Sequence, residues 1–527
     1  MRRPLCGATL VGLLALTACG GGSGNGDDSD AAGGGGSGPE GEFTIAYGSQ
    51  PPTLDPSATT GTVTRHIGRL MYEQLIAFDS NGEVRPVLAE SFDHSEDATT
   101  VTFQLRDDVQ FHNGEPMEAT DVVASLERWV ELADVGQQYF AEADIDSPED
   151  GVVTVTLPEG MGVMPELLAE PTQSPYIMPA EIAQEADPDG ATENIGTGPY
   201  QYGEWATDQH VRLDAFASYT SPAGETDGIT GEREANFENI YFNFVSDSST
   251  RLTGIQTLEY DMAMPLPWDN AEMIDGTDGV YIEPGETTFG AVIFNKQQGP
   301  MADINMRRAV YAAFEPEPVL QAAFNNDQFY GTATSLSPES SPWYHESDHE
   351  MADMVHTQDL DAAEQYLEEA DYAGETLTFM TTRDNEEHYN QAVIIQQQLI
   401  DAGIDVELEV LDWPSVLENQ SNPDIWDLTI TGFSWRELPA TNAFLQPSFA
   451  GWTDDDAIAE AIEDFLYAGS EDEAVQAAAD LQDAYFEYLP VLQTGRFATL
   501  AALNDDYEGF VNIPGTGEVY YHVDRTQ

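Results

Sequence analysis

The stretch TLTFMTTRDNEEHYNQAVIIQQQLIDAGIDVELEV, residues 376–410, decides the fold class. Residues 376–380 have the pattern of a β-strand, residues 390–402 have the spacing of a helix, and apolar side chains alternate again over 404–410. Gly403 stands just after the helix, where a left-handed C-terminal cap favours glycine. A strand, a helix and a strand in this order form a βαβ unit with two parallel strands, so the sequence predicts an α/β protein.

The regions on both sides of this unit continue the mixed pattern. The sequence predicts a helix that opens at Thr120 and Asp121 and buries one apolar face that includes Trp129. It also predicts strands at 43–47, 99–105, 150–157 and 424–433, a helix at 362–369, and two helices between residues 455 and 489. Because strand and helix signals mix along the chain and no internal repeat is present, we expect a discontinuous α/β fold.

The N-terminus has the features of an export segment. A cationic start at 1–3 precedes an apolar run over 5–18, which is too short to span a bilayer comfortably. Leu16-Thr17-Ala18-Cys19 resembles the bacterial lipobox, and the resemblance implies that Cys19 becomes lipidated. The alternative is a plain signal peptide in which Cys19 is incidental. The Gly/Ser/Asp-rich segment that completes 19–41 would act as a flexible tether spanning roughly 25 Å, so we expect a lipid-anchored protein on the extracytoplasmic face of the cell membrane.

The charge composition excludes several partners. The chain has 96 acidic and 17 basic residues, and its net charge of −79 is spread along the sequence. At molar salt the screening length falls to about 3 Å, which removes most of the self-repulsion. The acids therefore indicate adaptation to a saline habitat, and no basic face exists for nucleic acid. The only cysteines are Cys6 and Cys19, so the folded body has no disulfide or thiol chemistry.

Short motifs follow one another along almost the whole chain after the tether. They are Thr53–Pro56, Pro86–Phe92, Leu105–Arg128, Gly196–Tyr200, Phe294–Val310, Gln396–Ile404 and Tyr488–Pro490. In this order they resemble the peptide/nickel-type family of extracytoplasmic solute-binding proteins of ABC importers, which includes dipeptide- and oligopeptide-binding proteins. Most of these motifs read as turns, caps and packing positions of the scaffold.

The resemblance implies a periplasmic-binding-protein-like fold with two hinged lobes and an extra α/β domain inserted in the N-terminal lobe. The expected division is a signal peptide at 1–18, a tether at 19–41, lobe I at 43–60, 197–287 and 490–527, the extra domain at 61–196, and lobe II at 288–489. It also implies a monomeric binding protein that needs no cofactor and performs no catalysis. It would capture peptides by hinge closure and deliver them to the membrane subunits of the permease.

The resemblance also points to ligand contacts. In peptide-binding members, an aspartate after the strand at 424–433 binds the ligand's ammonium group, and its position, counted back from Pro439, falls on Trp435. Tryptophan cannot replace an anionic partner, and Glu437 is the nearest acid that can take this role. The full set of expected ligand contacts is Gln50, Arg383, Trp413, Gly432, Phe433, Ser434, Trp435, Arg436 and Glu437.

Two of these contacts have alternatives. Arg383 lies near the arginine that pairs with a dipeptide carboxylate in similar proteins, but it can equally neutralise Asp384 or Glu386. Trp413 would supply an aromatic wall together with Phe433 and Trp435, although one or more of these rings can belong to the core. A neutral, aromatic-walled cleft would also suit an oligosaccharide, and a metal chelate is a further alternative.

One catalytic pattern remains to be weighed. His345-Glu346-Ser347-Asp348-His349 matches the H-E-x-x-H pattern of zinc peptidases, which requires a helix with both histidines on one face. The preceding Ser340–Tyr344 segment and the absence of an apolar stripe favour a surface loop. We therefore expect no metal and no enzyme activity, and the zinc peptidase stays a remote alternative.

Overall fold

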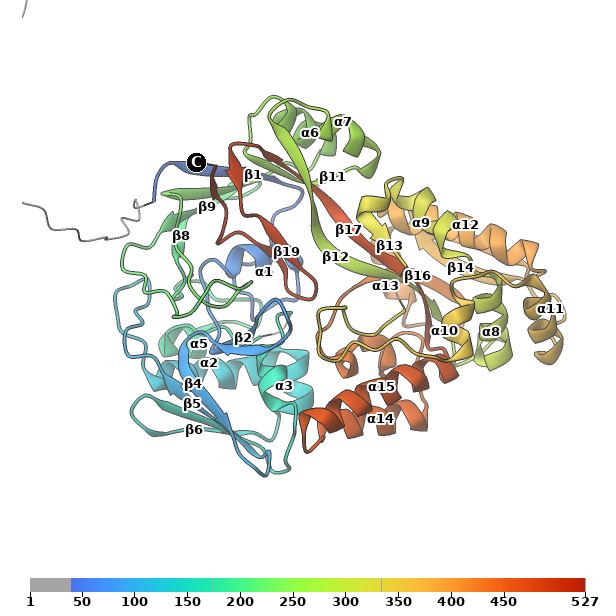
Figure 1. The fold of residues 1–527 in the computed structure, drawn as a ribbon, viewed down its shortest axis with the longest axis horizontal. Coiled ribbons are helices and arrows are strands. Elements are labelled where there is room, and N and C mark those ends of the chain that lie inside the picture. Colours follow the sequence, from blue (N-terminus) through green and yellow to red (C-terminus); the bar gives the residue numbers. More distant parts are fainter. Residues whose placement is uncertain (1–38, 173, 333, 527) are drawn as a thin grey trace, which may run out of the picture. The chain divides into compact units, whose positions relative to one another are not determined.

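The computed structural model describes residues 39–526 except residues 173 and 333 (Figure 1). The predicted signal segment, Cys19 and almost all of the tether lie outside the described residues. Within the described part of the chain, none of the helices is long and apolar enough to cross a membrane.

A mixed sheet of eleven strands organises the described chain. Its order is β15 (Val406–Leu411), β14 (Leu377–Thr382), β16 (Leu428–Ser434), β12 (Val280–Phe294), β17 (Val491–Asn504), β11 (Met262–Leu266), β1 (Glu42–Tyr47), β10 (Asn239–Phe244), β9 (His210–Ala215) and β8 (Tyr200–Ala206), with β13 (Tyr330–Gly331) paired to β17. We call the part built on β1 and β8–β11 lobe I and the part built on β14–β16 lobe II. The long strands β12 and β17 pair with each other along most of their length and join the two lobes (Figure 1).

The predicted βαβ unit is confirmed in lobe II. Strands β14 and β15 are parallel, with Leu377 opposite Val406, and α12 (Glu386–Asp401) connects them. Gly403 has φ +90°, as the predicted C-terminal cap requires. The helix begins four residues before the predicted start at residue 390, because Glu386 and Glu387 occupy its first turn, where acids interact favourably with the helix dipole.

Strand β16 begins later than the sequence predicts. The predicted strand covers 424–433, whereas β16 covers Leu428–Ser434. The Asn295 side-chain amide donates hydrogen bonds to the carbonyls of Pro423 (2.7 Å) and Trp426 (2.8 Å), so the segment before β16 is held as a turn.

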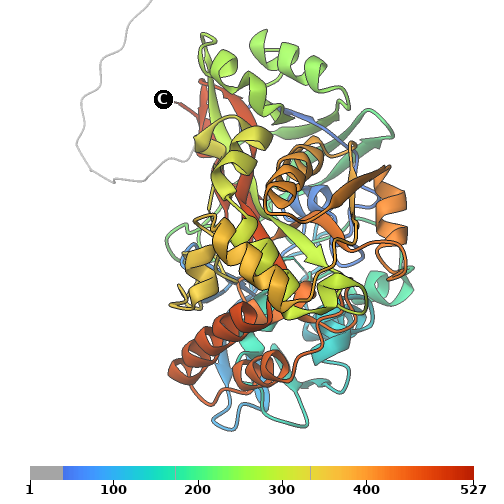
Figure 2. The same ribbon diagram turned by 90° about the vertical axis from the view of Figure 1, so that its right-hand side faces the viewer.

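Helices cover the sheet of lobe II and bury its core. They include the predicted helices α11 (Leu360–Glu369), α14 (Asp456–Leu466) and α15 (Glu471–Tyr488), together with α8 (Ile304–Ala313), α9 (Pro316–Phe324), α10 (Glu350–Met354) and α13 (Trp413–Asn419). Figure 2 shows the α14–α15 pair and the other helices of this part from the side. The core contains fully buried aromatic and aliphatic side chains such as Phe289, Tyr311, Leu399 and Phe465.

A second, smaller sheet lies in the N-terminal part. Its antiparallel order is β4 (Ala89–His94), β5 (Thr100–Leu105), β7 (Val152–Thr156) and β6 (Asp144–Glu149), which confirms the strands predicted at 99–105 and 150–157. The helix α2 (Ala119–Leu132) packs Trp129 into this core. Its N-cap is Glu118 in a capping box with Asp121, so the prediction that Thr120 and Asp121 open the helix was late by two residues.

Two family motifs meet in a buried ion pair. Asp55, from the motif Thr53–Pro56, accepts a hydrogen bond from Arg128 at 2.6 Å, and both side chains are buried. Asp55 also accepts from the backbone N–H of Ala191 (3.0 Å). The pair therefore fixes the loop that leads into α1 (Thr62–Gly68) against α2, as expected for motifs that shape the scaffold.

Candidate functional site

The carboxyl ends of the three strands of lobe II meet at one edge of the sheet. Strand β14 is parallel to both β15 and β16, and the three strands end at Thr382, Leu411 and Ser434. Open α/β sheets bind ligands outside the carboxyl ends of their parallel strands. Arg383, Trp413 and residues 435–437 follow directly after these ends, so the structure brings the predicted residues of lobe II to one edge.

Successive residues of β16 face opposite sides of the sheet. A Cβ atom on Gly432 would point toward His388, 3.8 Å from its Nε2, and the His388 ring lies 5.5 Å from that of Trp413. Phe433 faces the other side and stacks on Phe289 at 5.6 Å. Trp413 and Phe433 therefore lie on different sides of the sheet and do not form one aromatic wall.

Trp435 belongs to the same aromatic group as Phe433. Its ring lies 5.1 Å from Phe289, and the side chain is only 4% exposed. Phe433 is half-buried and also contacts Phe444 at 5.2 Å. Trp435 and part of Phe433 therefore pack in the hydrophobic core, which is the alternative role that the sequence left open for these rings.

Arg383 contacts an aromatic side chain. Its guanidinium lies 4.3 Å from the ring centre of Tyr389 and donates a hydrogen bond of 2.6 Å to the Tyr389 hydroxyl. Among the residues that the structure describes, Arg383 forms no ion pair with Asp384 or Glu386 within 4.0 Å, and its role stays a prediction. The Asp384 carboxylate instead accepts from the backbone N–H of Trp413 (2.8 Å).

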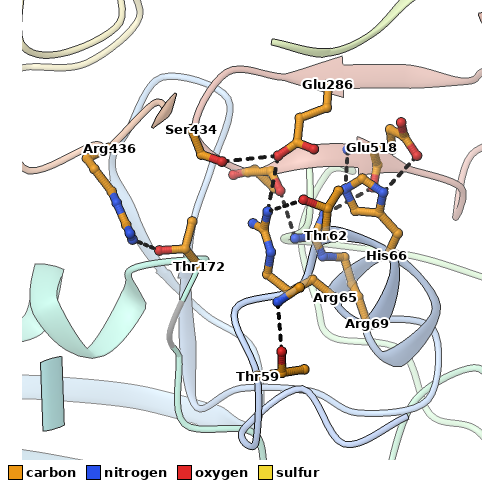
Figure 3. Close-up of polar contacts among 12 residues, drawn as sticks. Thr59, Thr62, Arg65, His66, Arg69, Thr172, Glu286, Ser434, Arg436 and Glu518 are labelled. Atoms are coloured by element: carbon orange, nitrogen blue, oxygen red, sulfur yellow. Dashed lines mark hydrogen bonds and ion pairs between the residues drawn. The ribbon is translucent and has the colours of Figure 1, made fainter. Parts of the chain in front are cut away.

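Arg436 reaches from lobe II to the N-terminal part of the chain. Its Nη1 donates to the Thr172 hydroxyl (Figure 3). The same nitrogen lies 3.6 Å from Glu170 Oε1. Glu170 is fully buried, and burial raises its pKa although Arg436 acts in the opposite direction. Residues far apart in sequence are therefore joined by one polar contact at the carboxyl edge of the sheet.

Arg65, on α1, makes a second contact to the joining strands. Its Nη2 lies 3.1 Å from Glu286 Oε1 on β12 and 3.4 Å from the Thr62 hydroxyl (Figure 3). Burial alone raises the pKa of Glu286, but Arg65 and His66 outweigh it and hold the pKa below its usual value. Ser434 lies 3.5 Å from the same Glu286 oxygen, so β16 and α1 share this carboxylate.

Residues 516–518, near the C-terminus, contact His66 and Arg69 at the end of α1. His66 Nδ1 lies 2.8 Å from Glu518 Oε2, and the backbone N–H of Glu518 approaches His66 Nε2 at 3.3 Å. Arg69 donates to the carbonyls of Thr516 (2.8 Å) and Glu518 (3.1 Å). The position of Arg65 therefore depends on β20 (Gly517–Val519) near the end of the chain.

Glu437 is buried next to Arg436 in sequence and lies near Glu170. Its backbone carbonyl accepts from the hydroxyls of Ser337 (3.3 Å) and Ser341 (3.2 Å). Burial, with a smaller contribution from Glu170, raises the pKa of Glu437 to about 8. The carboxyl is therefore mostly protonated at neutral pH, which makes it a weak partner for an ammonium group.

Two hollows border the site. A hollow of about 260 Å³ is lined by residues 56–60, Thr172 and Ser174. A larger one of about 710 Å³ is lined by hydroxyl side chains and by three acids, Glu339, Glu346 and Asp353, together with Trp435 and with Arg496 of β17. A hollow of about 910 Å³, larger than both, lies along β3 (Val84–Pro86) and residues 222–231 and is lined by none of the predicted contacts, so size alone does not locate the site.

Gln50 is held within lobe I. Its Oε1 accepts from the backbone N–H of Asp208 (2.8 Å) and from Trp205 Nε1 (3.3 Å). These contacts join Gln50 to the turn between β8 and β9, and the hydrogen bonds within the described residues do not connect it to lobe II.

The H-E-x-x-H pattern lacks the helix that zinc chemistry needs. Residues 344–349 are irregular, and His349 is the N-cap of α10, where its Nδ1 accepts from the backbone N–H of Met351 (3.2 Å). No group of three or more His, Cys, Asp or Glu side chains among the described residues is arranged to hold a metal ion. The two histidines therefore do not share a helical face.

The sequence did not point to Arg65, Glu170, Thr172, Glu286 or His388. Arg65 carried only a weak signal, because it is one of only 17 basic residues in the chain. The two glutamates carried none, since they are two acids among 96 acidic residues.

Two lobes joined by paired strands, with polar side chains at the carboxyl ends of three parallel strands, are the architecture of a ligand-binding protein. Residues 83–456 match the model of the bacterial extracellular solute-binding proteins, family 5, and the chain belongs to this family. It is thus a solute-binding protein of the type that serves ABC importers.

Individual relatives agree with this assignment. The chain is 26% identical over 506 residues to the probable peptide ABC transporter periplasmic-binding protein y4tO of Sinorhizobium fredii, covering 90% of this chain and 91% of the relative. It is 26% identical over 384 residues to the glutathione-binding protein GsiB of Escherichia coli O1:K1, covering 70% of each. The dipeptide-binding protein of Pseudoalteromonas sp. SM9913, solved with Met-Leu, has the same fold, with a TM-score of 0.73, 20% identity, and coverage of 92% of this chain and 100% of that one.

Proposed function

We propose that this protein captures peptides outside the cell by closure of its two lobes and delivers them chemically unaltered to an ABC permease. The observation that carries the proposal is the meeting of Arg436, Glu170 and Thr172 at the carboxyl edge of β14–β16. These side chains come from segments more than 260 residues apart, so a hinge motion that separates the lobes would separate them as well. Closure would assemble the polar surface around the solute.

Peptide as the solute is supported by two relatives in particular. The y4tO protein is named as a probable peptide-binding protein and GsiB as a glutathione-binding protein. The proposed contacts in this chain are Arg383, Trp413 and residues 432–437 from lobe II, with Gln50 from lobe I. Arg65 and Thr172 extend this set.

An oligosaccharide is the second candidate. The hollow of about 710 Å³ is lined in part by hydroxyl side chains of residues 334–347 and by the carboxylates of Glu339, Glu346 and Asp353, which are groups that hydrogen-bond to sugar hydroxyls. This volume lies within the range typical of small-molecule sites.

The cellular setting is part of the proposal. Lipidation at Cys19 and the tether at 19–41 would hold the folded part near the membrane as a monomer. The acidic composition would keep that part soluble in a saline habitat. The domain limits given above, with lobe II at 288–489 and the extra domain at 61–196, belong to the same proposal.

Native mass spectrometry of the full-length chain, purified in molar salt, tests the function directly. We expect a co-purified di- or oligopeptide that is released on denaturation and has an unaltered mass after incubation with fresh protein. A co-purified oligosaccharide or metal chelate would contradict the peptide assignment. Turnover of any bound peptide would contradict the role of a carrier.

A further inference from the structure

The Glu437 side chain extends from lobe II toward two turns on the other side of the joining strands. A Cβ atom on Gly82 would lie 3.1 Å from its Oε2, and a Cβ atom on Gly515 would lie 2.8 Å from its Oε1. Gly82 lies in the turn between β2 (Ile76–Phe78) and β3, and Gly515 lies in the turn between β19 (Val511–Ile513) and β20. Neither turn belongs to lobe II, so the carboxyl of Glu437 is enclosed only while lobe II stays against them.

Within the described part of the chain, this carboxyl has no ion-pair partner. Glu437 is 3% exposed, and its Oε2 has no hydrogen-bond partner among the same residues. Arg436, its neighbour in sequence, directs Nη1 to Thr172 and Glu170 instead. Burial of an unpaired carboxylate is costly, so such a group takes up a proton and becomes neutral. The arrangement of the lobes in this structure therefore favours the protonated form of Glu437.

The titratable groups around Glu437 strengthen this preference. Burial is the main cause that raises its pKa to about 8, and the charges of Glu170 and Asp79 add to the rise. Residues 513–517, which form the turn around Gly515, include no titratable side chain. Glu339 belongs to the neighbouring segment of lobe II, but it is exposed. The groups that face the carboxyl from outside lobe II are thus either acidic or uncharged.

A second carboxyl is buried where lobe II meets the N-terminal part. Glu166, on α4 (Met164–Ala169), lines a hollow of about 510 Å³ together with Glu471 at the start of α15. Its Oε2 is buried without a partner among the described residues, and burial, with a smaller contribution from Glu471, raises its pKa to about 7. The described residues that line this hollow include no arginine or lysine, and its other titratable groups are Glu83, His94 and Glu96.

The two parts of the chain approach each other closely beside Glu166. A Cβ atom on Gly162, just before α4, would overlap the carbonyl oxygen of Ala468, just before α15. Only glycine at position 162 allows this approach of the two backbones. Figure 1 shows the α14–α15 pair beside the N-terminal part. Opening of the hinge would separate Gly162 from Ala468 and expose Glu166 to water.

Burial alone does not couple a carboxyl to the hinge. Glu518 is also buried, but its Oε2 lies 2.8 Å from His66 Nδ1 and accepts a hydrogen bond of 2.6 Å from the Tyr520 hydroxyl. Neither partner belongs to lobe II, so movement of lobe II leaves these contacts in place. Glu437 and Glu166 differ, because groups from the opposite side of the hinge complete their surroundings.

We propose that closure of the two lobes is coupled to proton uptake by Glu437 and Glu166, so that solute capture weakens as the pH rises. This coupling rests on the proposed function, because it acts on the hinge closure that the function requires. When the lobes open, both carboxyls regain water and ionise, and closure returns a proton to each. A group that binds its proton more tightly in the closed form favours that form at low pH. The contribution is lost as the pH rises through the raised pKa.

Peptide titrations at two pH values test the coupling. The full-length chain in molar salt is titrated with an equimolar mixture of di- to pentapeptides that contain no histidine, aspartate or glutamate. Small-angle X-ray scattering follows the decrease in the radius of gyration on closure. The peptide termini largely keep their charges between about pH 5 and about pH 7. We expect the peptide concentration for half-maximal compaction to be at least about tenfold higher at the upper pH, because each proton taken up contributes up to about tenfold per pH unit.

Glutamine variants locate the titrating groups. Glu437→Gln and Glu166→Gln keep the size of the side chains, and each should lose part of the pH dependence. In the double variant the two half-maximal concentrations should agree within about twofold. Glu460→Gln is the matched control, because Glu460 is exposed on α14 and should leave the whole pH dependence in place. Thermal unfolding of each variant shows whether it is folded.

A glycine variant tests the closing contact itself. Gly162→Ala should prevent compaction by the peptide mixture at both pH values, since the new Cβ atom would overlap the Ala468 carbonyl. Gly469→Ala is the matched control in the adjacent segment, because its Cβ atom would meet only the end of the flexible Glu473 side chain. Full compaction of Gly162→Ala would mean that the contact beside Glu166 is not part of closure and would overturn the role of that carboxyl.

The outcomes separate the proton coupling from the proposed function. Equal half-maximal concentrations at the two pH values in the unaltered chain overturn the coupling and leave the peptide carrier standing. A pH dependence that persists unchanged in the double variant also overturns it, because other groups would then titrate. Absence of compaction at both pH values contradicts the proposed peptide function together with the coupling.

Discussion

Arg251 and Arg307 differ from Arg65 and Arg436 in what their guanidinium groups contact. Every guanidinium nitrogen of Arg307 donates to backbone carbonyls of residues 301, 302 and 488, and every one of Arg251 donates to carbonyls of residues 245, 246 and 265. Arg65 and Arg436 instead contact side chains and retain free or accessible donors. The first pair completes the scaffold, and the second pair belongs to the ligand contacts that we propose.

A change in salt concentration should have the largest effect on stability. Salt screens the repulsion between exposed acids, whereas it hardly affects the buried ion pairs. Lowering the salt from molar to about 0.01 M lengthens the screening distance from about 3 Å to about 30 Å. We expect loss of the cooperative unfolding transition of the whole chain, followed by circular dichroism during heating. A transition temperature that is indifferent to salt would contradict the saline adaptation.

The Asp55–Arg128 pair should have the next largest effect, because it belongs entirely to the scaffold. Asp55→Ala leaves Arg128 buried without its partner, and loss of one member of a buried pair destabilises by about 3–5 kcal/mol. Urea denaturation measures the change in the free energy of unfolding. The exposed Asp97→Ala serves as the control and should change it by less than about 0.5 kcal/mol.

Arg307→Met and Arg436→Met sharpen the comparison of the two kinds of arginine. Arg307→Met orphans buried carbonyls and should destabilise by about 2–3 kcal/mol. Arg436→Met should destabilise by less than about 1 kcal/mol, because Glu170, whose pKa burial already raises, can take up a proton. Equal losses in urea denaturation would remove the distinction between scaffold and site arginines.

Glu437→Gln tests the buried carboxyl beside Arg436. Since its pKa rises to about 8 in the folded protein, the stability it contributes is full below the unfolded pKa and is lost as pH rises through about 8. The variant should match the unaltered chain at about pH 5 and be more stable by about 4 kcal/mol at about pH 9.

Calorimetric unfolding at the two pH values measures this difference. The exposed Glu339→Gln is the control and should show the same offset from the unaltered chain at both. A Glu437→Gln variant that is less stable at the higher pH would mean that the ionised carboxyl is the form that the fold requires.

Arg383→Ala should have the smallest effect on folding. Its guanidinium is exposed and contacts only Tyr389 in the described residues, so the free energy of unfolding should change by less than about 0.5 kcal/mol. Binding of the co-purified ligand, followed by tryptophan fluorescence, should nevertheless weaken, as it should in Trp413→Ala. Unchanged affinity in both variants would mean that the ligand lies elsewhere along the sheet edge.

Local sequence patterns predicted much of lobe II. Alternation and helical spacing located β14, α12 and β15, because both faces of these elements are set by near neighbours in the sequence. The family motifs indicated the two-lobe fold. The limits of β16 and α2 were shifted because Asn295 holds the turn before β16 and Glu118 provides the cap of α2.

The site was less predictable for a physical reason. Arg65 meets Glu286 over 221 positions of sequence, and Arg436 meets Thr172 over 264. No periodicity within one segment encodes such pairings, so these contacts became visible only once the sheet order was known. The side chains that follow directly after β14, β15 and β16 could be proposed as ligand contacts, because the ends of strands can be predicted from the sequence.

Glu518 lies close to the end of the chain and supports α1. The position of α1 is therefore fixed only after almost the whole chain has been made. The His66–Glu518 contact spans 452 positions, among the longest loops that a chain of this length can close. A chain translocated in the direction of its synthesis cannot hold Arg65 in place until the last few residues have emerged. Premature termination before residue 518 would therefore leave α1 without the contacts that Glu518 makes to His66 and Arg69.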